Sequence, residues 1–134
     1  MIGVVVVTHG QLATELLNAT ETIVGDLPRF AAVSIGWHED TGDARGEIEQ
    51  AIARVRQDRG VLILTDMFGG TPSNLALTFL GDDVEVITGV NLPMLIKLAG
   101  LADHADLLHA ARDIREQGRA AIWVASDLLR GDKS

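Results

Sequence analysis

The sequence predicts an α/β fold, with an open, mainly parallel, doubly wound sheet of strand order 2-1-3-4 plus an edge strand, and helices on both faces. The first observation is a set of short runs rich in valine and isoleucine that are mostly continuous rather than alternating. Such runs are typical of strands covered on both faces, as in a parallel sheet. The second is that segments with helical spacing separate these runs, which favours right-handed crossovers. The expected strands are Ile2–Thr8, Phe30–Ile35, Val61–Asp66, Val84–Thr88 and Ala120–Ala125.

Two of the intervening segments have a clear apolar face. The first helix is expected to bury Leu12, Leu16, Leu17 and Ile23. The second is expected to bury Ile48, Ala51, Ile52 and Val55, with charged residues on its other side.

Three later helices are indicated by their end signals. Pro72–Leu80 begins with a proline in the first turn, where the missing N–H costs nothing. The other two are expected over Asn91–Ala99 and Leu107–Gln117, with Gly100 and Gly118 as stops.

Composition favours a small cytoplasmic protein. The chain has 134 residues, 47% of them hydrophobic, which fits one domain over 1–130 with a frayed tail over 131–134. It has no cysteine, so a thiolate metal site and a cysteine nucleophile are excluded. Its net charge of -8 makes a nucleic-acid role improbable, whereas a basic protein partner would suit it. The N-terminal apolar run is too short to span a bilayer and no basic segment precedes it.

The expected topology brings two distant segments together. In an open α/β sheet, ligands bind beyond the carboxyl ends of the strands, where the strand order reverses. In the order 2-1-3-4 the first and third strands are neighbours at that point. His9 follows the first strand and Asp66 ends the third, so the two side chains are expected to face each other.

These residue types suit phosphoryl transfer. A carboxylate that accepts the Nδ1–H of an imidazole orients the ring and leaves Nε2 free as a nucleophile. The stretch Gly69-Gly70-Thr71-Pro72 allows close backbone approach and opens a helix, whose N–H groups favour an anion. Either loop alone is better explained as an ordinary turn or a rim histidine. Their joint placement instead predicts a phosphoryl group carried on His9, with Asp66 as orienting group.

Other kinds of site fit less well. A phosphoaspartate receiver needs an acidic pair after the first strand and a lysine after the fifth, and this chain has Thr8-His9 and Ser126-Asp127 there. A histidine phosphatase would place an arginine beside the first histidine, and a flavin fold would use more aromatic residues. A metal site would need ligands beyond His9, Asp66 and His38, whose spacing is no recognised pattern. We therefore expect no metal and no cofactor.

Three ordered motifs give the chain a family resemblance. Val-Thr-His-Gly at residues 7–10, Thr-Asp-Met-Phe-Gly-Gly-Thr-Pro-Ser-Asn at 65–74 and Gly-Val-Asn-Leu-Pro-Met-Leu at 89–95 resemble the mannose-family enzyme IIA of the phosphoenolpyruvate-dependent sugar phosphotransferase system. The likeness spans nearly the whole chain. It implies that His9 accepts phosphate from the carrier protein HPr and passes it to a histidine of enzyme IIB. Asp66 would be the partner of His9, and Thr71 would hold the phosphate together with Gly69 and Gly70.

The resemblance also implies a homodimer in which an edge strand, here Ala120–Ala125, is exchanged between subunits. Because the chain ends soon after that strand, enzyme IIB is expected to be a separate protein, and a membrane is involved only through a transporter complex. A regulatory, phosphorylation-dependent binding module and a phosphocarrier serving dihydroxyacetone kinase are the alternatives. Nothing in the sequence identifies a sugar.

The remaining residues of interest are three large apolar residues in loops and three histidines. Met67 and Phe68, apolar residues on the loop after the third strand, are predicted partner contacts, and Trp37 is equally explained as an interface anchor or a loop residue. The other histidines are interpreted as surface residues: His38, His104 and His109.

Overall fold

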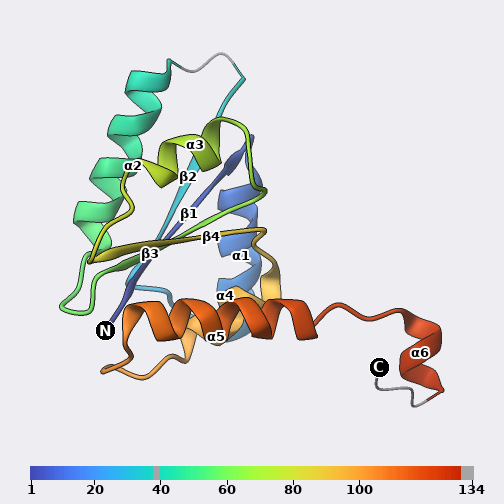
Figure 1. The fold of residues 1–134 in the computed structure, drawn as a ribbon. Coiled ribbons are helices and arrows are strands. Elements are labelled where there is room, and N and C mark those ends of the chain that lie inside the picture. The colour runs from blue at the N-terminus through green and yellow to red at the C-terminus, as the bar shows by residue number, and fades with distance from the viewer. Residues whose placement is uncertain (38–39, 131–134) are drawn as a thin grey trace.

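The sheet has the predicted order and direction. The computed structural model describes residues 1–37 and 40–130. Its strands are β1 (Gly3–His9), β2 (Phe30–Ile35), β3 (Val61–Thr65) and β4 (Val84–Thr88). They form one parallel sheet in the order β2-β1-β3-β4, as Figure 1 shows. The prediction of a parallel 2-1-3-4 sheet is thus confirmed.

Helices cover both faces of this sheet. Those that precede or follow the strands are α1 (Leu12–Val24), α2 (Thr41–Val55), α3 (Thr71–Leu77), α4 (Leu92–Ala99), α5 (Leu107–Ala120) and α6 (Ala125–Leu129). Helices α2 and α3 lie on one face, and α1, α4 and α5 lie on the other (Figure 1).

The valine run of β1 explains why both faces are apolar. Val5 and Val7 belong to the core under α2 and α3, whereas Val4 and Val6 belong to the core under α1, α4 and α5. All four are fully buried. A strand in the middle of a doubly covered sheet must be apolar at every position, which is the pattern that the sequence carries.

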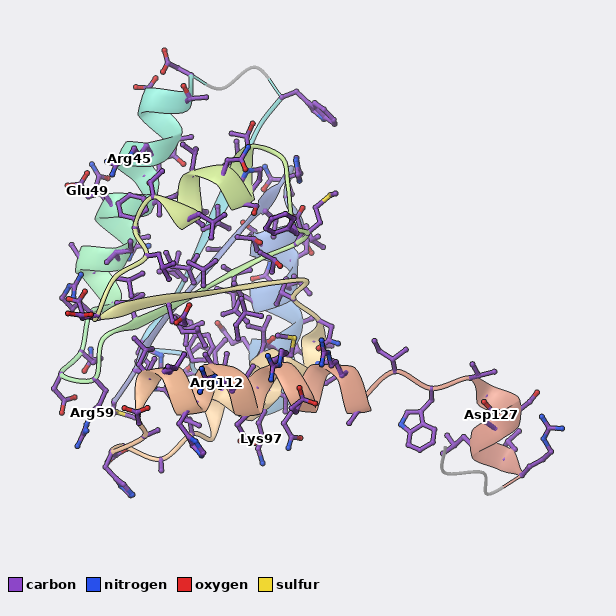
Figure 2. The ribbon with its side chains drawn as sticks, in the orientation of Figure 1. Arg45, Glu49, Arg59, Lys97, Arg112 and Asp127 are labelled. Carbon is purple, nitrogen blue, oxygen red and sulfur yellow. The ribbon has the colours of Figure 1, made fainter. Side chains whose placement is uncertain are left out.

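Among the described residues, charged side chains stay outside these two cores, with one exception. Arg45 and Glu49 pair along the outer side of α2 (Figure 2), with 3.7 Å between Nη1 and Oε2. The exception is Arg29, whose guanidinium is buried and donates to the carbonyl oxygens of Ile2, Leu98 and Ala99. Burial lowers the pKa of Arg29 from its usual value, although the charge of Asp103 opposes this.

The expected apolar face of α1 is only partly correct. Leu16 and Leu17 pack against the core, but Leu12 and Ile23 are exposed. The buried positions of the helix are instead Ala13 and Thr20. Thr20 satisfies its hydroxyl by donating to the carbonyl oxygen of Leu16, so a polar residue can occupy the inner face.

The fifth strand is absent from the described chain, so the prediction was wrong for a single chain, and the exchange of Ala120–Ala125 between subunits stays a prediction. Helix α5 runs through the expected stop at Gly118 and ends at Ala120. Gly118 faces Met94, because a Cβ added there would lie 2.6 Å from the Met94 sulfur. The glycine is therefore a packing residue and not a helix end. The residues after α5 form no strand and lead to α6, which stands apart from the sheet (Figure 1).

The remaining findings concern two helix ends and the search for a membrane-spanning helix. Helix α3 ends at Leu77, three residues before its expected end at Leu80. Helix α4 does end at Gly100, as expected. Among the described residues, no helix combines the length and the apolar character needed to cross a membrane. The tail 131–134 lies outside the described residues.

Candidate phosphoryl-transfer site

The carboxyl ends of β1 and β3 bring His9 and Asp66 into contact. The two strands are paired up to Val7 and Thr65, and the next residues of each chain segment form the rim. His9 Nδ1 lies 2.7 Å from Asp66 Oδ2, and the His9 backbone N–H donates to the same oxygen at 3.1 Å. The Met67 N–H donates to Asp66 Oδ1 at 3.1 Å. The expected juxtaposition is therefore present.

This contact determines which ring nitrogen is free. A carboxylate only accepts hydrogen bonds, so Nδ1 carries the hydrogen and Nε2 of the neutral ring keeps its lone pair. The His9 side chain is 38% exposed and that of Asp66 is 14% exposed. The His9 side chain is accordingly partly open to solvent, whereas the Asp66 carboxylate that contacts its Nδ1 is more sheltered.

The electrostatics of Asp66 favour its ionised form. Partial burial alone would raise its pKa, but the hydrogen bonds from the His9 ring and backbone, together with the charge that His9 carries when it is protonated, lower the pKa below the usual range for aspartate. The carboxylate is thus negative at neutral pH and can stabilise positive charge on the ring.

Gly70 leaves space beside Nε2. A Cβ built on Gly70 would lie 3.1 Å from both Nε2 and Cε1 of His9. Gly69 and Gly70 also have φ values of 89° and 85°, which side-chain-bearing residues rarely adopt. The two glycines therefore allow the loop to pass close to the ring, and the second keeps the region near Nε2 free of side-chain atoms.

The backbone of His9 is held by a residue that sequence reasoning missed. Thr8 is buried, and its hydroxyl accepts the Ala13 N–H at 2.6 Å and donates to the His9 carbonyl at 3.2 Å. Its signal was a polar residue at the end of an otherwise apolar strand, directly before a turn. Gly10, with a φ of 55°, then turns the chain into α1.

Comparison with known proteins assigns the chain to a family. Residues 3–114 match the model of EIIA-man, described as the PTS system fructose IIA component. The chain belongs to this family. It is similar to the fructose-specific EIIA component of Bacillus subtilis, with 29% identity over 100% of this chain and 93% of that protein. It is also similar to the mannose-specific EIIAB component of Escherichia coli, with 33% identity over 72% of this chain, but it spans only 30% of that relative.

A solved structure supports the same assignment. The PTS IIA protein associated with the fucose utilization operon of Streptococcus pneumoniae superposes with a TM-score of 0.83 and 26% identity, covering 95% of each chain. The Streptococcus agalactiae EIIA component, at 23% identity and a TM-score of 0.83, shares the fold. This chain is thus a IIA component of a sugar phosphotransferase system.

The other described residues that the sequence indicated are exposed. Thr71 is the exposed first residue of α3, and its hydroxyl makes no hydrogen bond to another described residue. Met67 and Phe68 are exposed on the loop after β3. The Trp37 ring lies 6.4 Å from the His9 ring, centroid to centroid. His104 and His109 are exposed, as expected, and His38 lies outside the described residues.

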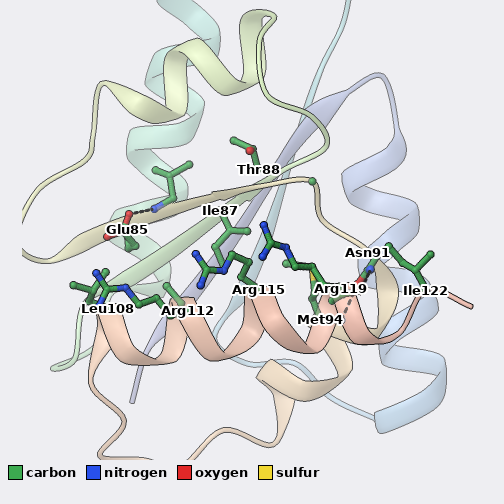
Figure 3. Close-up of a pocket in the computed structure, with 14 residues that line it drawn as sticks. Glu85, Ile87, Thr88, Asn91, Met94, Leu108, Arg112, Arg115, Arg119 and Ile122 are labelled. Carbon is green, nitrogen blue, oxygen red and sulfur yellow. Dashed lines mark hydrogen bonds between the residues drawn. The ribbon is translucent and has the colours of Figure 1, made fainter. Parts of the chain in front are cut away.

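Two further features bear on what the IIA chain can bind. In residues 1–37 and 40–130, no group of three or more His, Cys, Asp or Glu is arranged to hold a metal ion. A groove of about 490 Å³ runs between the edge strand β4 and helix α5, and it is lined by Ile87, Met94 and three arginines of α5 (Figure 3). The arginines are Arg112, Arg115 and Arg119. Neither His9 nor Asp66 lines this groove.

Proposed function

We propose that this IIA component is a phosphocarrier that accepts a phosphoryl group from phosphorylated HPr on His9 Nε2 and passes it to a histidine of an enzyme IIB protein. The observation that carries the proposal is the 2.7 Å contact between His9 Nδ1 and Asp66 Oδ2 beside the open space at Gly70. Family membership supports the same reaction class.

The proposed transfer uses three features of the site. The Nε2 lone pair attacks phosphorus, the N–P bond of the donor histidine breaks, and a new Nε2–P bond forms. His9 keeps its Nδ1–H, so the ring gains positive charge, which the Asp66 carboxylate stabilises. The glycine loop and the Thr71 hydroxyl at the start of α3 would contact the phosphoryl oxygens. Transfer to enzyme IIB is the same step in reverse, with the partner's ring as acceptor.

The test is labelling with phosphoenolpyruvate, enzyme I and HPr. We expect one phosphoryl group per chain, in an acid-labile and alkali-stable bond. His9→Ala should abolish the label, whereas His38→Ala, His104→Ala and His109→Ala should retain it. Label on the His9→Ala protein would exclude the proposed site. Label on wild type that never moves to any enzyme IIB would instead support a regulatory module.

We further propose that the chain forms a homodimer through its C-terminal segment. Ile122, Trp123 and Val124 follow α5 and are each more than half exposed. Val124 already has extended backbone angles. In the described chain, the outer edge of β4 has no neighbouring strand, and the groove runs beside it. An unpaired edge and an exposed apolar extended segment are complementary, so the expected strand would form only on a second copy.

A further inference from the structure

The turn between β4 and α4 holds the end of β3, the strand that leads into Asp66. The Gly89 and Val90 N–H groups both donate to the Thr65 carbonyl oxygen, each at 2.9 Å. Gly89 has a φ of 93°, which lets the chain bend back over this oxygen. Thr65 is fully buried, and its carbonyl belongs to the peptide unit that leads into Asp66. The turn therefore holds the backbone from which the Asp66 carboxylate extends toward His9.

Asn91, the next residue along the chain, ties this turn to two helices. Its Oδ1 accepts the Met94 N–H at 3.2 Å and so caps α4. Its Nδ2 donates to the Gly118 carbonyl oxygen, in the last turn of α5, at 3.1 Å (Figure 3). A Cβ added to Gly118 would lie 3.5 Å from Asn91 Oδ1 and 2.6 Å from the Met94 sulfur. The Asn91 side chain is thus held at both ends, where α4 and α5 pack closely.

Helix capping explains only one half of this side chain. Serine, aspartate and asparagine are about equally good caps, because each offers an oxygen to the first helical turn. Helix α5, for example, begins after Asp106, whose carboxylate accepts the His109 N–H at 3.0 Å. A carboxylate could accept at α4 but could not donate to α5, whereas the amide of Asn91 does both. The contact with Gly118 therefore needs an explanation other than capping.

That explanation lies in the position of Asp66. Its Oδ2 contacts His9 at both Nδ1 and the backbone N–H, so a shift of the Asp66 backbone would disturb the ring. A misplacement of about 1 Å, even when its cause lies far from the chemistry, can cost about a hundredfold in rate. In the described chain, hydrogen bonds and peptide units lead without a break from Gly118 through Asn91 and the turn to Thr65.

We propose that Asn91 is a positioning residue for phosphoryl transfer. It fixes the turn between β4 and α4 on the end of α5, and the turn in turn holds Asp66 against His9. This inference rests on the proposed function and adds a residue that acts from outside the site. Asn91 forms no bond to the phosphoryl group. It acts through the backbone at the end of β3 and so determines how the His9 ring is presented.

Serine substitutions at two helix starts separate positioning from capping. Asn91→Ser keeps an oxygen that can cap α4 but lacks the NH₂ group that reaches Gly118. Asp106→Ser is the matched control, because Asp106 caps the other end of α5. We expect Asn91→Ser to accept phosphate from phosphorylated HPr about tenfold more slowly at saturation, with an unchanged half-saturating concentration. Asp106→Ser should transfer at the wild-type rate, and thermal melts check that both variants are folded.

Phosphoramidate, a small phosphoryl donor, tests whether the effect lies at His9 itself. It should also label Asn91→Ser about tenfold more slowly than wild type, because the ring is misplaced for any donor. Slow transfer from phosphorylated HPr alone would show that Asn91 acts on partner binding, and would overturn the proposal. Wild-type rates with both donors would overturn it as well. Wild-type protein that neither donor labels would contradict the proposed function instead.

NMR gives a readout that does not depend on transfer. Long-range ¹H–¹⁵N spectra, recorded where the ring is neutral, show which nitrogen of His9 carries the hydrogen, and His9→Ala assigns the signals. The contact with Asp66 predicts Nδ1. We expect this tautomer alone in wild type and Asp106→Ser, and a mixture of both tautomers in Asn91→Ser. A pure Nδ1–H tautomer in Asn91→Ser would show that Asp66 stays in place without Asn91, and would refute the positioning role.

Discussion

Asp66 contacts both the ring and the backbone of His9, so its charge matters more than its shape. Asp66→Asn keeps the size of the side chain but removes the negative charge and can turn its NH₂ toward the ring, favouring the wrong tautomer. Charge-assisted hydrogen bonds are about twice as strong as neutral ones, so we expect a loss of roughly 1–3 kcal/mol in the transfer barrier. This corresponds to about ten- to a hundredfold in rate.

Stopped-flow transfer from phosphorylated HPr measures this rate, and thermal melts check the fold. The melting temperature should change less than the rate, because the amide leaves no charge unpaired and its carbonyl oxygen can still accept a backbone N–H from His9 or Met67. A wild-type rate in Asp66→Asn would remove Asp66 from the mechanism and leave His9 in need of another orienting group.

The two neighbouring glycines offer a controlled test of the space beside Nε2. Gly69→Ala and Gly70→Ala both place a side chain at positive φ, at a cost of about 1–3 kcal/mol in stability. Only the Gly70 Cβ would meet the His9 ring, since no heavy atom lies within 4 Å of the corresponding position at Gly69. We therefore expect similar losses in denaturant stability but a much slower transfer in Gly70→Ala alone. Equal transfer rates in the two variants would show that this space is not used.

At the scale of the element, α5 shows how packing overrides a local stop signal. Gly118→Ala would place its Cβ 2.6 Å from the Met94 sulfur, so we expect destabilisation by about 1–3 kcal/mol from overpacking. Gly46→Ala in α2 is the matched control, because no heavy atom lies within 4 Å of the new Cβ. There the higher helix propensity of alanine should stabilise the protein by about 0.5–1 kcal/mol. Urea unfolding measures both, and stabilisation by both substitutions would contradict the packing role of Gly118.

The elements that sequence reasoning missed share a physical cause. The predicted helix stop at Gly118 was wrong because this glycine packs against Met94. The predicted apolar face of α1 was only partly right because contacts with the neighbouring sheet determine which side of the helix is buried. Arg29 could not be recognised as buried, because its partners are backbone carbonyls at two distant places, near Ile2 and at the end of α4. The residues 120–125 have the composition of a strand, but composition does not determine whether the segment reaches the free edge of β4 in its own chain.

For the whole molecule, topology was the most predictable level, and it also made the site predictable. The strand order alone places the end of β1 beside the end of β3, so the His9–Asp66 contact followed from the sequence. Trp37 could be placed beside His9 only from the coordinates, because the path of the loop after β2 is not encoded in a periodic pattern. The roles of these residues in transfer stay predictions until the labelling and kinetic experiments are done.

The assembly is the last prediction. If the segment after α5 pairs with β4 of a second copy, the exposed side chains of Ile122, Trp123 and Val124 become buried, and each buried side chain of this size contributes roughly 1.5–3 kcal/mol. We expect a dimer of about twice the 14.3 kDa chain mass in multi-angle light scattering at micromolar concentration. The double variant Ile122→Lys, Val124→Lys should be monomeric, because the segment would then carry positive charge into a groove that is lined by Arg112, Arg115 and Arg119. Leu80→Ala, a substitution of an exposed apolar residue outside the segment, should stay dimeric.

The monomeric variant should still accept phosphate, since His9 and Asp66 belong to one chain. A wild-type protein that is monomeric at every micromolar concentration would refute the exchange and leave the apolar segment after α5 without a partner.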